Sequence, residues 1–226
     1  MRLFLAVAAA GLALVAYGLA AGAVEAVRIG VSATAAGGLC ALLLVCGSRW
    51  GKARLARALL RRLALRGDER MLDLGCGSGV MLVTAGTLLP HGHAVGVDRW
   101  LAWQQRGSDP RTCLANAAAL GVSDRVRVAT ADMTALPFPD ASFDLVTASL
   151  SVQTLRDRAL RRAAVAEAVR VLRPGGRLLI LDFTHTRQYA ADARAAGLRE
   201  VRRSRPYGPV FPPVRTVTGR KPRTEP

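Results

Sequence analysis

Hydrophobic and polar positions divide the chain into an apolar N-terminal part and a mixed remainder. Residues 3–24 form a run of 22 positions without a charged side chain, and residues 29–48 form a second run of 20. Only residues 25–28, which include Glu25 and Arg28, separate the two runs. A helix needs about 20 apolar residues to cross the hydrocarbon core of a bilayer, so the pattern predicts a transmembrane hairpin over residues 1–48.

The first run also resembles a signal peptide, because Arg2 precedes it and the small residues 21–23 resemble a cleavage site. It is longer than the apolar region of a signal peptide, and a second apolar run follows at once, which favours the hairpin. Small residues spaced four apart would let the two predicted helices approach closely: Gly18 with Gly22, and Ala33 with Gly37.

Basic residues are distributed unevenly around the predicted hairpin. The loop between the two runs contains only Arg28, whereas the segment after the hairpin contains Arg49, Lys52, Arg54, Arg57, Arg61, Arg62 and Arg66. The positive-inside rule therefore predicts a multi-pass protein of the cell membrane, with both termini and the following domain in the cytoplasm.

Residues 49–66 are predicted to form a basic juxtamembrane helix, because leucines recur every fourth position among arginines: Leu55, Leu59 and Leu63. One interpretation is a helix that lies in the membrane interface and contacts anionic lipid. The other is a connecting helix whose leucines pack against the next domain. Both interpretations keep that domain at the membrane surface.

From residue 67 onward, apolar runs of strand length alternate with helical stretches. The predicted strands are residues 70–74, 93–97, 125–129, 143–148 and 177–181, and the predicted helices are 80–88, 110–120, 158–172 and 187–196. Residues 201–204 and 214–218 are predicted to add one or two closing strands. This alternation predicts one doubly wound α/β domain over residues 67–226, with a mostly parallel sheet and helices on both faces.

A glycine-rich motif lies between the first predicted strand of this domain and its first helix. Residues 71–79 read Met-Leu-Asp-Leu-Gly-Cys-Gly-Ser-Gly. The three glycines allow a tight turn and a close approach to a ligand, and the helix N-terminus that follows favours negative charge. A nicotinamide-binding motif would have glycine or alanine where this chain has Val80, so the spacing excludes that pattern.

Four further stretches follow the glycine motif: residues 95–98 (Val-Gly-Val-Asp), 130–133 (Thr-Ala-Asp-Met), 136–146 and 171–178. In this order and spacing, the five motifs resemble those of the class I S-adenosylmethionine-dependent methyltransferases. The chain is similar to their small-molecule branch, which includes the ubiquinone- and menaquinone-type enzymes. The resemblance implies a Rossmann-like fold, S-adenosylmethionine as cofactor, and methyl transfer to a small or lipophilic acceptor.

The resemblance also implies which residues bind the cofactor. Asp98, 23 residues after Gly75, stands where the family has an acid that binds the ribose hydroxyls, and a carboxylate can accept from both. The Asp132 side chain would bind the exocyclic amine of adenine, and the Met133 backbone N–H a ring nitrogen. The full predicted set is Asp73, Gly75, Cys76, Gly77, Gly79, Asp98, Arg99, Asp132, Met133 and Ser149.

Candidates for the acceptor side follow the carboxyl ends of the predicted strands. His185, Asp182 and Gln153 are the candidates for catalysis, with His185 as a general base or, alternatively, as a residue that caps the next helix or shapes the pocket. Gln153 stands near a position where related enzymes often have histidine, and it cannot take a proton. Trp100 and Trp103 are predicted either to cover an apolar acceptor or to pack against their own loop.

Composition adds a strong positive charge to this picture. The chain has 32 Lys and Arg residues against 16 acids, and its 51% hydrophobic content excludes the disordered class. The charge favours an anionic neighbour, either a membrane face or nucleic acid. Arginines are frequent near the C-terminus, so one alternative is an RNA methyltransferase, although no recognisable RNA-binding module and no motif for base methylation is present.

A second alternative is a membrane protein that binds the cofactor but does not catalyse a reaction. The complete set of motifs counts against this alternative.

The four cysteines form no CxxC pair and have no histidine at metal-ligand spacing: Cys40, Cys46, Cys76 and Cys113. No metal site and no disulfide framework is therefore predicted.

Overall fold

The computed structural model describes residues 2–46, 51–101, 108–207 and 212–223. The chain forms two compact units that divide near Lys52. Arg49, Trp103 and the predicted end of the second span at residue 48 lie outside the described residues.

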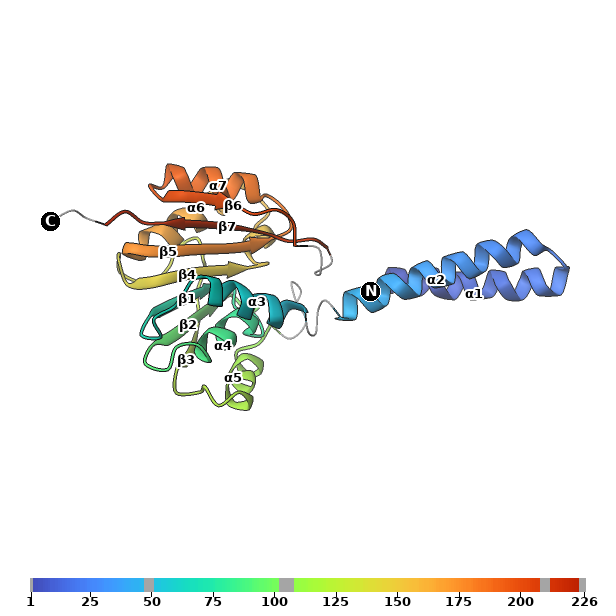
Figure 1. Ribbon diagram of the computed structural model, residues 1–226, viewed down its shortest axis with the longest axis horizontal. Helices are drawn as coiled ribbons and strands as arrows, with labels where there is room; N and C mark the ends of the chain where they lie inside the picture. The colour runs from blue at the N-terminus through green and yellow to red at the C-terminus, as the bar shows by residue number, and fades with distance from the viewer. Residues whose placement is uncertain (1, 47–50, 102–107, 208–211, 224–226) are drawn as a thin grey trace. The chain divides into compact units, whose positions relative to one another are not determined.

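The first unit is a pair of helices, α1 (Arg2–Ala21) and α2 (Val24–Cys46), that pack along each other (Figure 1). The two backbones approach closely at glycines. A Cβ atom added at Gly37 would lie 2.7 Å from the Phe4 carbonyl oxygen, and one added at Gly30 would lie 2.7 Å from the Gly11 carbonyl oxygen. The interface is therefore made by small residues that leave room for direct backbone contact.

The turn of the hairpin lies earlier than the sequence predicted. Gly22 adopts a φ of 66° between the two helices, and nothing lies within 4 Å of its would-be Cβ. Residues 25–28, predicted as the loop, belong to α2, where Arg28 and Glu25 form an ion pair of 3.0 Å one helical turn apart. Glycine at the turn and an acid in the first turn of α2 both favour this arrangement.

The glycines at the helix interface are spaced seven apart rather than four: Gly11 with Gly18, and Gly30 with Gly37. Of the two predicted pairs, Gly18 and Gly37 lie at the interface, whereas Gly22 lies in the turn. Seven residues are close to two helical turns, so this spacing returns to the same side of a helix.

The second unit begins with α3 (Lys52–Arg62), which is amphipathic. Its buried residues are Ala56, Leu59 and Leu60, while Leu55 and Leu63 are half-buried. The leucines therefore pack within this unit, as the second interpretation of the juxtamembrane helix predicted. The exposed side of α3 consists largely of arginines: Arg54, Arg57, Arg61 and Arg62.

The remainder is a sheet of seven strands in the order β3-β2-β1-β4-β5-β7-β6. The strands are β1 (Arg70–Leu74), β2 (His93–Asp98), β3 (Val126–Thr130), β4 (Phe143–Ser149), β5 (Leu172–Asp182), β6 (Arg199–Arg203) and β7 (Arg215–Arg220). The first five are parallel, and β7 is antiparallel to both β5 and β6. This confirms the predicted doubly wound, mostly parallel sheet, and two closing strands are present.

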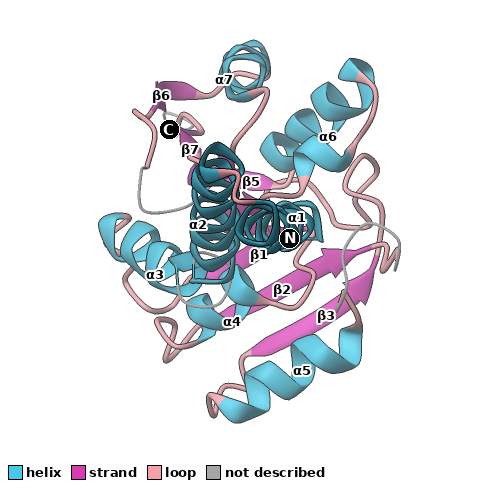
Figure 2. Ribbon diagram, turned by 90° about the vertical axis from the view of Figure 1, so that its right-hand side faces the viewer, coloured by secondary structure: helices cyan, strands magenta, loops and turns pink. Residues whose placement is uncertain are grey.

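Helices cover both faces of the sheet, as Figure 2 shows. One face is covered by α3, α4 (Val80–Gly86) and α5 (Pro110–Ala119), and the other by α6 (Arg158–Arg170) and α7 (Thr186–Ala195). The core on the second face contains residues of β1, β4 and β5 together with fully buried side chains such as Tyr189 of α7. The first six residues of β4 are all buried, as expected for a strand that is covered on both faces, although Asp144 and Thr147 are polar.

One boundary differs clearly from the sequence-based expectation. The helix predicted for residues 158–172 ends at Arg170, and β5 begins at Leu172 instead of residue 177. The Lys221 ammonium donates to the carbonyls of Val169, Arg170 and Leu172, which satisfies the end of α6. Lys221, which is distant in the sequence, thus caps the C-terminal end of α6.

Candidate cofactor site

The glycine motif forms a loop at the carboxyl end of β1. Gly75, Gly77 and Gly79 all have positive φ angles, of 67°, 51° and 86°. The backbone N–H groups of Gly75 and Cys76 donate to the Val97 carbonyl at 2.8 and 3.1 Å. The loop is therefore fixed to the end of the neighbouring strand β2.

Two of the glycines are also required by contacts within the protein. A Cβ atom at Gly75 would lie 2.4 Å from the Ser151 Cβ, and one at Gly79 would lie 2.6 Å from the Cys113 Sγ. Ser151 itself is buried and donates from its hydroxyl to the Leu74 carbonyl at 2.6 Å. The close packing of the β1 loop against the segment after β4 and against α5 thus adds a second reason for glycine here.

Asp98 lies at the end of β2, beside the glycine loop. Its Oδ2 accepts from the Gly77 backbone N–H at 2.9 Å, and its Oδ1 accepts from the Trp100 backbone N–H at 2.8 Å. A carboxylate has about four lone-pair positions, so Asp98, which is half-buried, keeps the capacity to accept from two hydroxyls. This geometry fits the ribose of S-adenosylmethionine.

Asp132 and Met133 lie after β3, next to this carboxylate. Asp132 accepts from the backbone N–H and hydroxyl of Thr134 at 2.9 and 2.7 Å, and pairs with Arg99 at 3.2 Å. The Thr134 hydrogen bonds, followed by the Arg99 charge, hold the pKa of Asp132 below its usual range. The Met133 methyl group lies 3.1 Å from the would-be Cβ of Gly75, so Met133 packs over the glycine loop.

Asp73 is the predicted cofactor-binding residue that the fold places deepest. Its carboxylate is buried within β1 and accepts from the Thr147 hydroxyl at 2.7 Å. Burial raises its pKa to about 7. Cys76 is also buried, whereas Arg99 is exposed and Ser149, the last residue of β4, is half-buried. Asp73 thus lies beneath the glycine loop, inside the sheet, whereas Asp98 lies beside the loop and is partly accessible.

The acceptor-side candidates surround the carboxyl ends of β4 and β5. Asp182 is fully buried and accepts from the Phe183 backbone N–H at 2.9 Å, from the Gln153 backbone N–H at 3.3 Å and from the Tyr189 hydroxyl at 3.3 Å. Burial raises the pKa of Asp182 to about 6. Through these bonds Asp182 joins the 3-10 turn η2 (Val152–Thr154) to β5 and α7.

His185 is the candidate that remains accessible. It is exposed and precedes α7 with a φ of 52°, and its side chain makes no capping hydrogen bond. Gln153 is half-buried and donates from its amide to the Leu150 carbonyl at 3.5 Å. Trp100 donates from its ring to the Thr130 hydroxyl at 3.0 Å, which ties it to β3.

Three of the six non-glycine residues with positive φ among the described residues lie at this edge of the sheet. These three follow the ends of β2, β4 and β5: Trp100, Leu150 and His185, at 55°, 56° and 52°. Such residues cluster at functional sites, and ligands of open α/β sheets bind at the carboxyl ends of the strands.

Thr147 and Tyr189, the partners of the two buried carboxylates, were not predicted as site residues. Thr147 lies 74 positions from Asp73, and Tyr189 lies seven positions after Asp182, across the turn from β5 into α7, so no motif marks either pair.

No group of three or more His, Cys, Asp or Glu side chains in the described ranges is arranged to hold a metal ion. The glycine loop, the rim carboxylate and the mostly parallel sheet together define a class I S-adenosylmethionine-dependent methyltransferase domain.

Comparison with known proteins supports this assignment. Residues 72–180 match the methyltransferase domain family. The 27-O-demethylrifamycin SV methyltransferase of Amycolatopsis mediterranei is 37% identical over 152 residues, 66% of this chain and 51% of the relative. The demethylmenaquinone methyltransferase of Thermus thermophilus is 34% identical over 118 residues, 52% of this chain and 49% of the relative. The chain spans about half the length of the curated relatives it matches.

Solved structures share the fold at lower identity. A SAM-dependent methyltransferase from Aquifex aeolicus aligns with a TM-score of 0.58 at 19% identity, over 73% of this chain and 88% of that chain. The [4+2]-cyclase SpnF aligns with a TM-score of 0.63 at 20% identity, over 76% of this chain and 81% of that chain. The family and fold imply S-adenosylmethionine as methyl donor, while the cyclase shows that the fold alone does not fix the reaction.

Proposed function

We propose that this protein is a membrane-anchored enzyme that transfers a methyl group from S-adenosylmethionine to a small, lipophilic acceptor at the cytoplasmic face of the membrane. The observation that carries the membrane part is the packing of the N-terminal hairpin. Its helices bury glycines against each other and expose large apolar side chains, such as Leu19 with 70% of its surface accessible.

A water-soluble helix pair buries its large apolar side chains, whereas this pair exposes them and buries small residues. The two helices have mean hydropathies of 2.3 and 1.2. Only 11% and 17% of the residues in their most apolar 18-residue segments are buried. A core helix of a soluble protein would be mostly buried, and an apolar surface of this extent in water would associate. Lipid tails solvate large apolar side chains, and transmembrane helices associate through small residues, which supports a spanning hairpin.

The basic residues support the proposed topology and surface contact. Arg28 is the only basic residue near the turn, while α3 exposes four arginines just after the hairpin. Only five residues separate Cys46 from Lys52, which limits an extended chain to about 20 Å. If α2 spans the bilayer, α3 therefore begins close to the surface, where its arginines can meet anionic lipid.

The chemistry assigned to the chain's own residues is mainly binding and orientation. When bound, S-adenosylmethionine supplies an electrophilic methyl group. Asp98 and the Met133 backbone N–H would hold its ribose and adenine, and the loop at Gly77 would lie against it. Asp182 fixes the segment after β4 that borders the acceptor side. His185 is the exposed titratable side chain that would take a proton from an acceptor that carries one.

The acceptors named for the relatives share this lipophilic character. The names of two relatives specify demethylmenaquinone and 27-O-demethylrifamycin SV. A third relative, from Caenorhabditis elegans, is named as a sterol methyltransferase and is 28% identical over 145 residues, 59% of this chain and 37% of the relative. Large apolar acceptors partition into bilayers, so an enzyme held at the surface would meet its substrate there.

The test is radiolabelled methyl transfer from S-adenosylmethionine by the full-length protein in membranes, followed by extraction of lipids and RNA. We expect label in the lipid extract. Asp98→Ala should weaken cofactor binding about ten- to a hundredfold, because a charged hydrogen bond is lost, whereas the exposed Asp124→Ala should not. Label in RNA alone, or equal binding by both variants, would contradict the proposal.

A separate experiment tests the anchor. The full-length chain should stay in membranes after washing with high salt and with alkaline carbonate, because burial of apolar helices does not depend on charge. Release by carbonate would exclude the spanning hairpin while leaving the proposed methyl transfer open to its own assay.

A further inference from the structure

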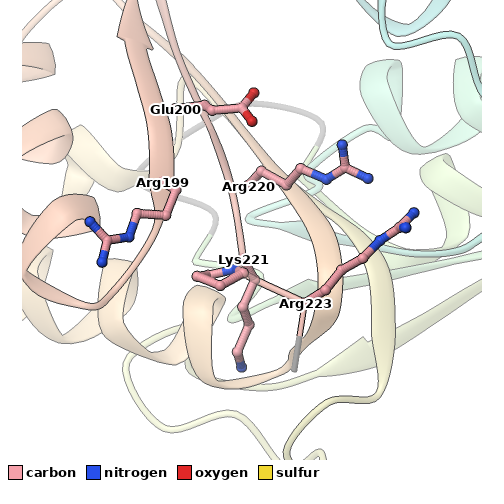
Figure 3. Close-up of a pocket in the computed structure, with 6 residues that line it drawn as sticks. Arg199, Glu200, Arg220, Lys221 and Arg223 are labelled. Carbon is pink, nitrogen blue, oxygen red and sulfur yellow. The ribbon is translucent and has the colours of Figure 1, made fainter. Parts of the chain in front are cut away.

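Arginines occupy directly opposite positions on three neighbouring strands at one end of the sheet. Arg177 of β5 pairs in register with Arg220 of β7, and Arg220 pairs with Arg199 of β6. Like charges at opposite positions destabilise a sheet. The Arg199 side chain points away from Arg220 (Figure 3), so the repulsion lies mainly between Arg220 and Arg177 and favours negative charge near these two.

Glu200 is the acid that lines the adjoining hollow together with Arg199, Arg220 and Arg223. The two buried acids nearest Arg177 are already engaged. Glu69 is buried, accepts from the backbone N–H groups of Arg66 and Gly67 at 2.8 and 2.9 Å, and pairs with Arg177 at 3.4 Å. The buried Asp144 forms ion pairs with Arg66 and Arg173. Burial, together with the charges of Arg220 and Arg66, lowers the pKa of Arg177 below its usual range.

A hollow of about 230 Å³ lies beside Arg177 and Arg220, and five arginines and two carboxylates line it: Arg66, Arg173, Arg177, Arg220 and Arg223, with Glu69 and Asp144. Arg220 also lines an adjoining hollow of about 440 Å³. Figure 3 shows the side chains of Arg220 and Arg223 extending to the same side, while Lys221 points elsewhere, toward the end of α6. Among the described residues, the Arg220 guanidinium makes one hydrogen bond, from Nε to the Gly175 carbonyl at 3.3 Å, and four further N–H donors of this group make none.

This surface lies away from the cofactor loop. Arg220 pairs with Arg177, and Asp182, at the carboxyl end of β5, is five residues further along the strand. At about 3.3 Å per residue the two positions are about 17 Å apart. A ligand held by Arg220 and Arg223 would therefore not be the methyl acceptor.

We propose that this hollow is a binding site for a phosphate-bearing anion, separate from the site of methyl transfer. Guanidinium groups bind phosphate oxygens through paired hydrogen bonds, and several arginines around one hollow match a group with more than one negative charge. The same chemistry is available from an anionic lipid headgroup and from a soluble phosphate or diphosphate. The site goes beyond the proposed function, because neither cofactor binding nor anchoring by the hairpin requires it.

The primary test uses the full-length protein in nanodiscs of neutral lipid, titrated calorimetrically with inorganic pyrophosphate. We expect saturable binding at one site. Arg220→Gln should weaken it at least tenfold, because a charge-assisted hydrogen bond is lost. Arg127→Gln is the matched control, since Arg127 is exposed on β3 at the other edge of the sheet, and it should bind as the unmodified chain does. Absence of saturable binding below millimolar pyrophosphate, or equal binding by Arg220→Gln, would overturn the proposal.

Thermal unfolding provides a second readout. Without pyrophosphate, Arg220→Gln should raise the unfolding midpoint, because it relieves the repulsion between Arg220 and Arg177; a purely structural arginine would lower it on substitution. If Arg220→Gln does not fold, Arg223→Gln replaces it, because Arg223 lies beyond the end of β7. Pyrophosphate should raise the midpoint of the unmodified chain but not that of Arg223→Gln. Equal increases in both proteins would overturn the proposal.

Nanodiscs that contain anionic lipid distinguish the two sources of phosphate. If a headgroup occupies the hollow, pyrophosphate binding should weaken at least tenfold in anionic nanodiscs at constant ionic strength, in the unmodified chain and in Arg127→Gln. If the ligand is soluble, binding should be the same in neutral and anionic nanodiscs.

Discussion

The sheet domain buries its large apolar side chains in its interior, whereas the hairpin exposes them on its surface. In the sheet domain, Leu72 and similar residues are fully buried and arginines are on the surface, whereas in the hairpin Leu12 is 60% exposed and glycines are inside. In water, burial of large apolar groups is the main driving force for folding, so they collect in the core. In lipid that force between helices is absent, and close backbone contact replaces it. The difference supports the proposal that the hairpin is packed for lipid and the sheet domain for water.

The largest expected effect is on the free energy of unfolding, which a leucine-to-alanine substitution should lower strongly in the sheet domain and hardly at all in the hairpin. Leu72→Ala should lower the free energy of unfolding of the sheet domain by about 2–5 kcal/mol, because it leaves a cavity in the core. Leu12→Ala should change it by less than about 0.5 kcal/mol. Urea unfolding of the full chain in micelles, followed by tryptophan fluorescence, measures both. Equal losses would contradict the comparison.

The buried carboxylates of the sheet domain provide a pH test. The pKa of Asp73 is raised from 3.8 to about 7 in the folded protein, so its contribution to stability is fully present below pH 3.8 and is lost as the pH rises toward 7. Asp73→Asn should remove this decline, which amounts to up to about 4 kcal/mol. Urea unfolding at several pH values between 4 and 8 measures it, with the exposed Asp124→Asn as control. An unchanged slope in Asp73→Asn would show that another group is responsible.

Two adjacent glycines of α2 test the close packing of the hairpin. Gly37→Leu would place a side chain against the Phe4 carbonyl, whereas nothing lies within 4 Å of the would-be Cβ of Gly38. We expect Gly37→Leu to cost about 1–3 kcal/mol through overpacking and to separate the helices by about 2 Å. Distances between spin labels at Leu3 and Leu39 measure the separation. Gly38→Leu adds the same apolar surface and should leave the distance unchanged; a shift in both variants would indicate a general effect of leucine.

The smallest expected effect concerns a hydroxyl between the helices. Thr34 donates to the Gly30 carbonyl at 2.8 Å and lies 3.4 Å from the Ala8 carbonyl of α1. Thr34→Val should cost the hairpin only about 0.6 kcal/mol, the typical value for a polar contact between transmembrane helices. Thermal unfolding of the full chain in micelles, monitored through the hairpin spin labels, measures it. A loss as large as that of Gly37→Leu would mean that the hydrogen bond, rather than the glycines, holds the hairpin together.

Much of the fold could be predicted because its signals are local. The apolar runs predicted two helices, and the alternation of strands and helices predicted the sheet. The glycine motif predicted the loop at Gly75 and Gly77, and the acid at the end of β2 predicted a carboxylate beside it, which Asp98 provides. The individual assignments of cofactor-binding residues remain predictions, although the fold brings Asp98, Met133 and the glycine loop together.

What the sequence could not predict depends on contacts between distant residues. Asp73 accepts from Thr147, 74 positions away, and Asp182 accepts from Tyr189 only because the chain turns back from β5 into α7, so the sequence alone did not separate these buried carboxylates from the accessible Asp98. The C-terminal arginines suggested nucleic acid when read as a linear cluster. Antiparallel pairing of β7 with β5 instead places Arg220 opposite Arg177, at the end of the sheet away from the glycine loop.

The sequence by itself determined the two regions of this protein, the class of its fold and the cofactor motif, because hydrophobic periodicity and glycine spacing act over a few residues. Only the tertiary structure decided which glycines of the hairpin touch, that the leucines of α3 pack within the globular unit, and which arginines share a hollow. These outcomes depend on strand register and helix contact, which join residues tens to more than a hundred positions apart.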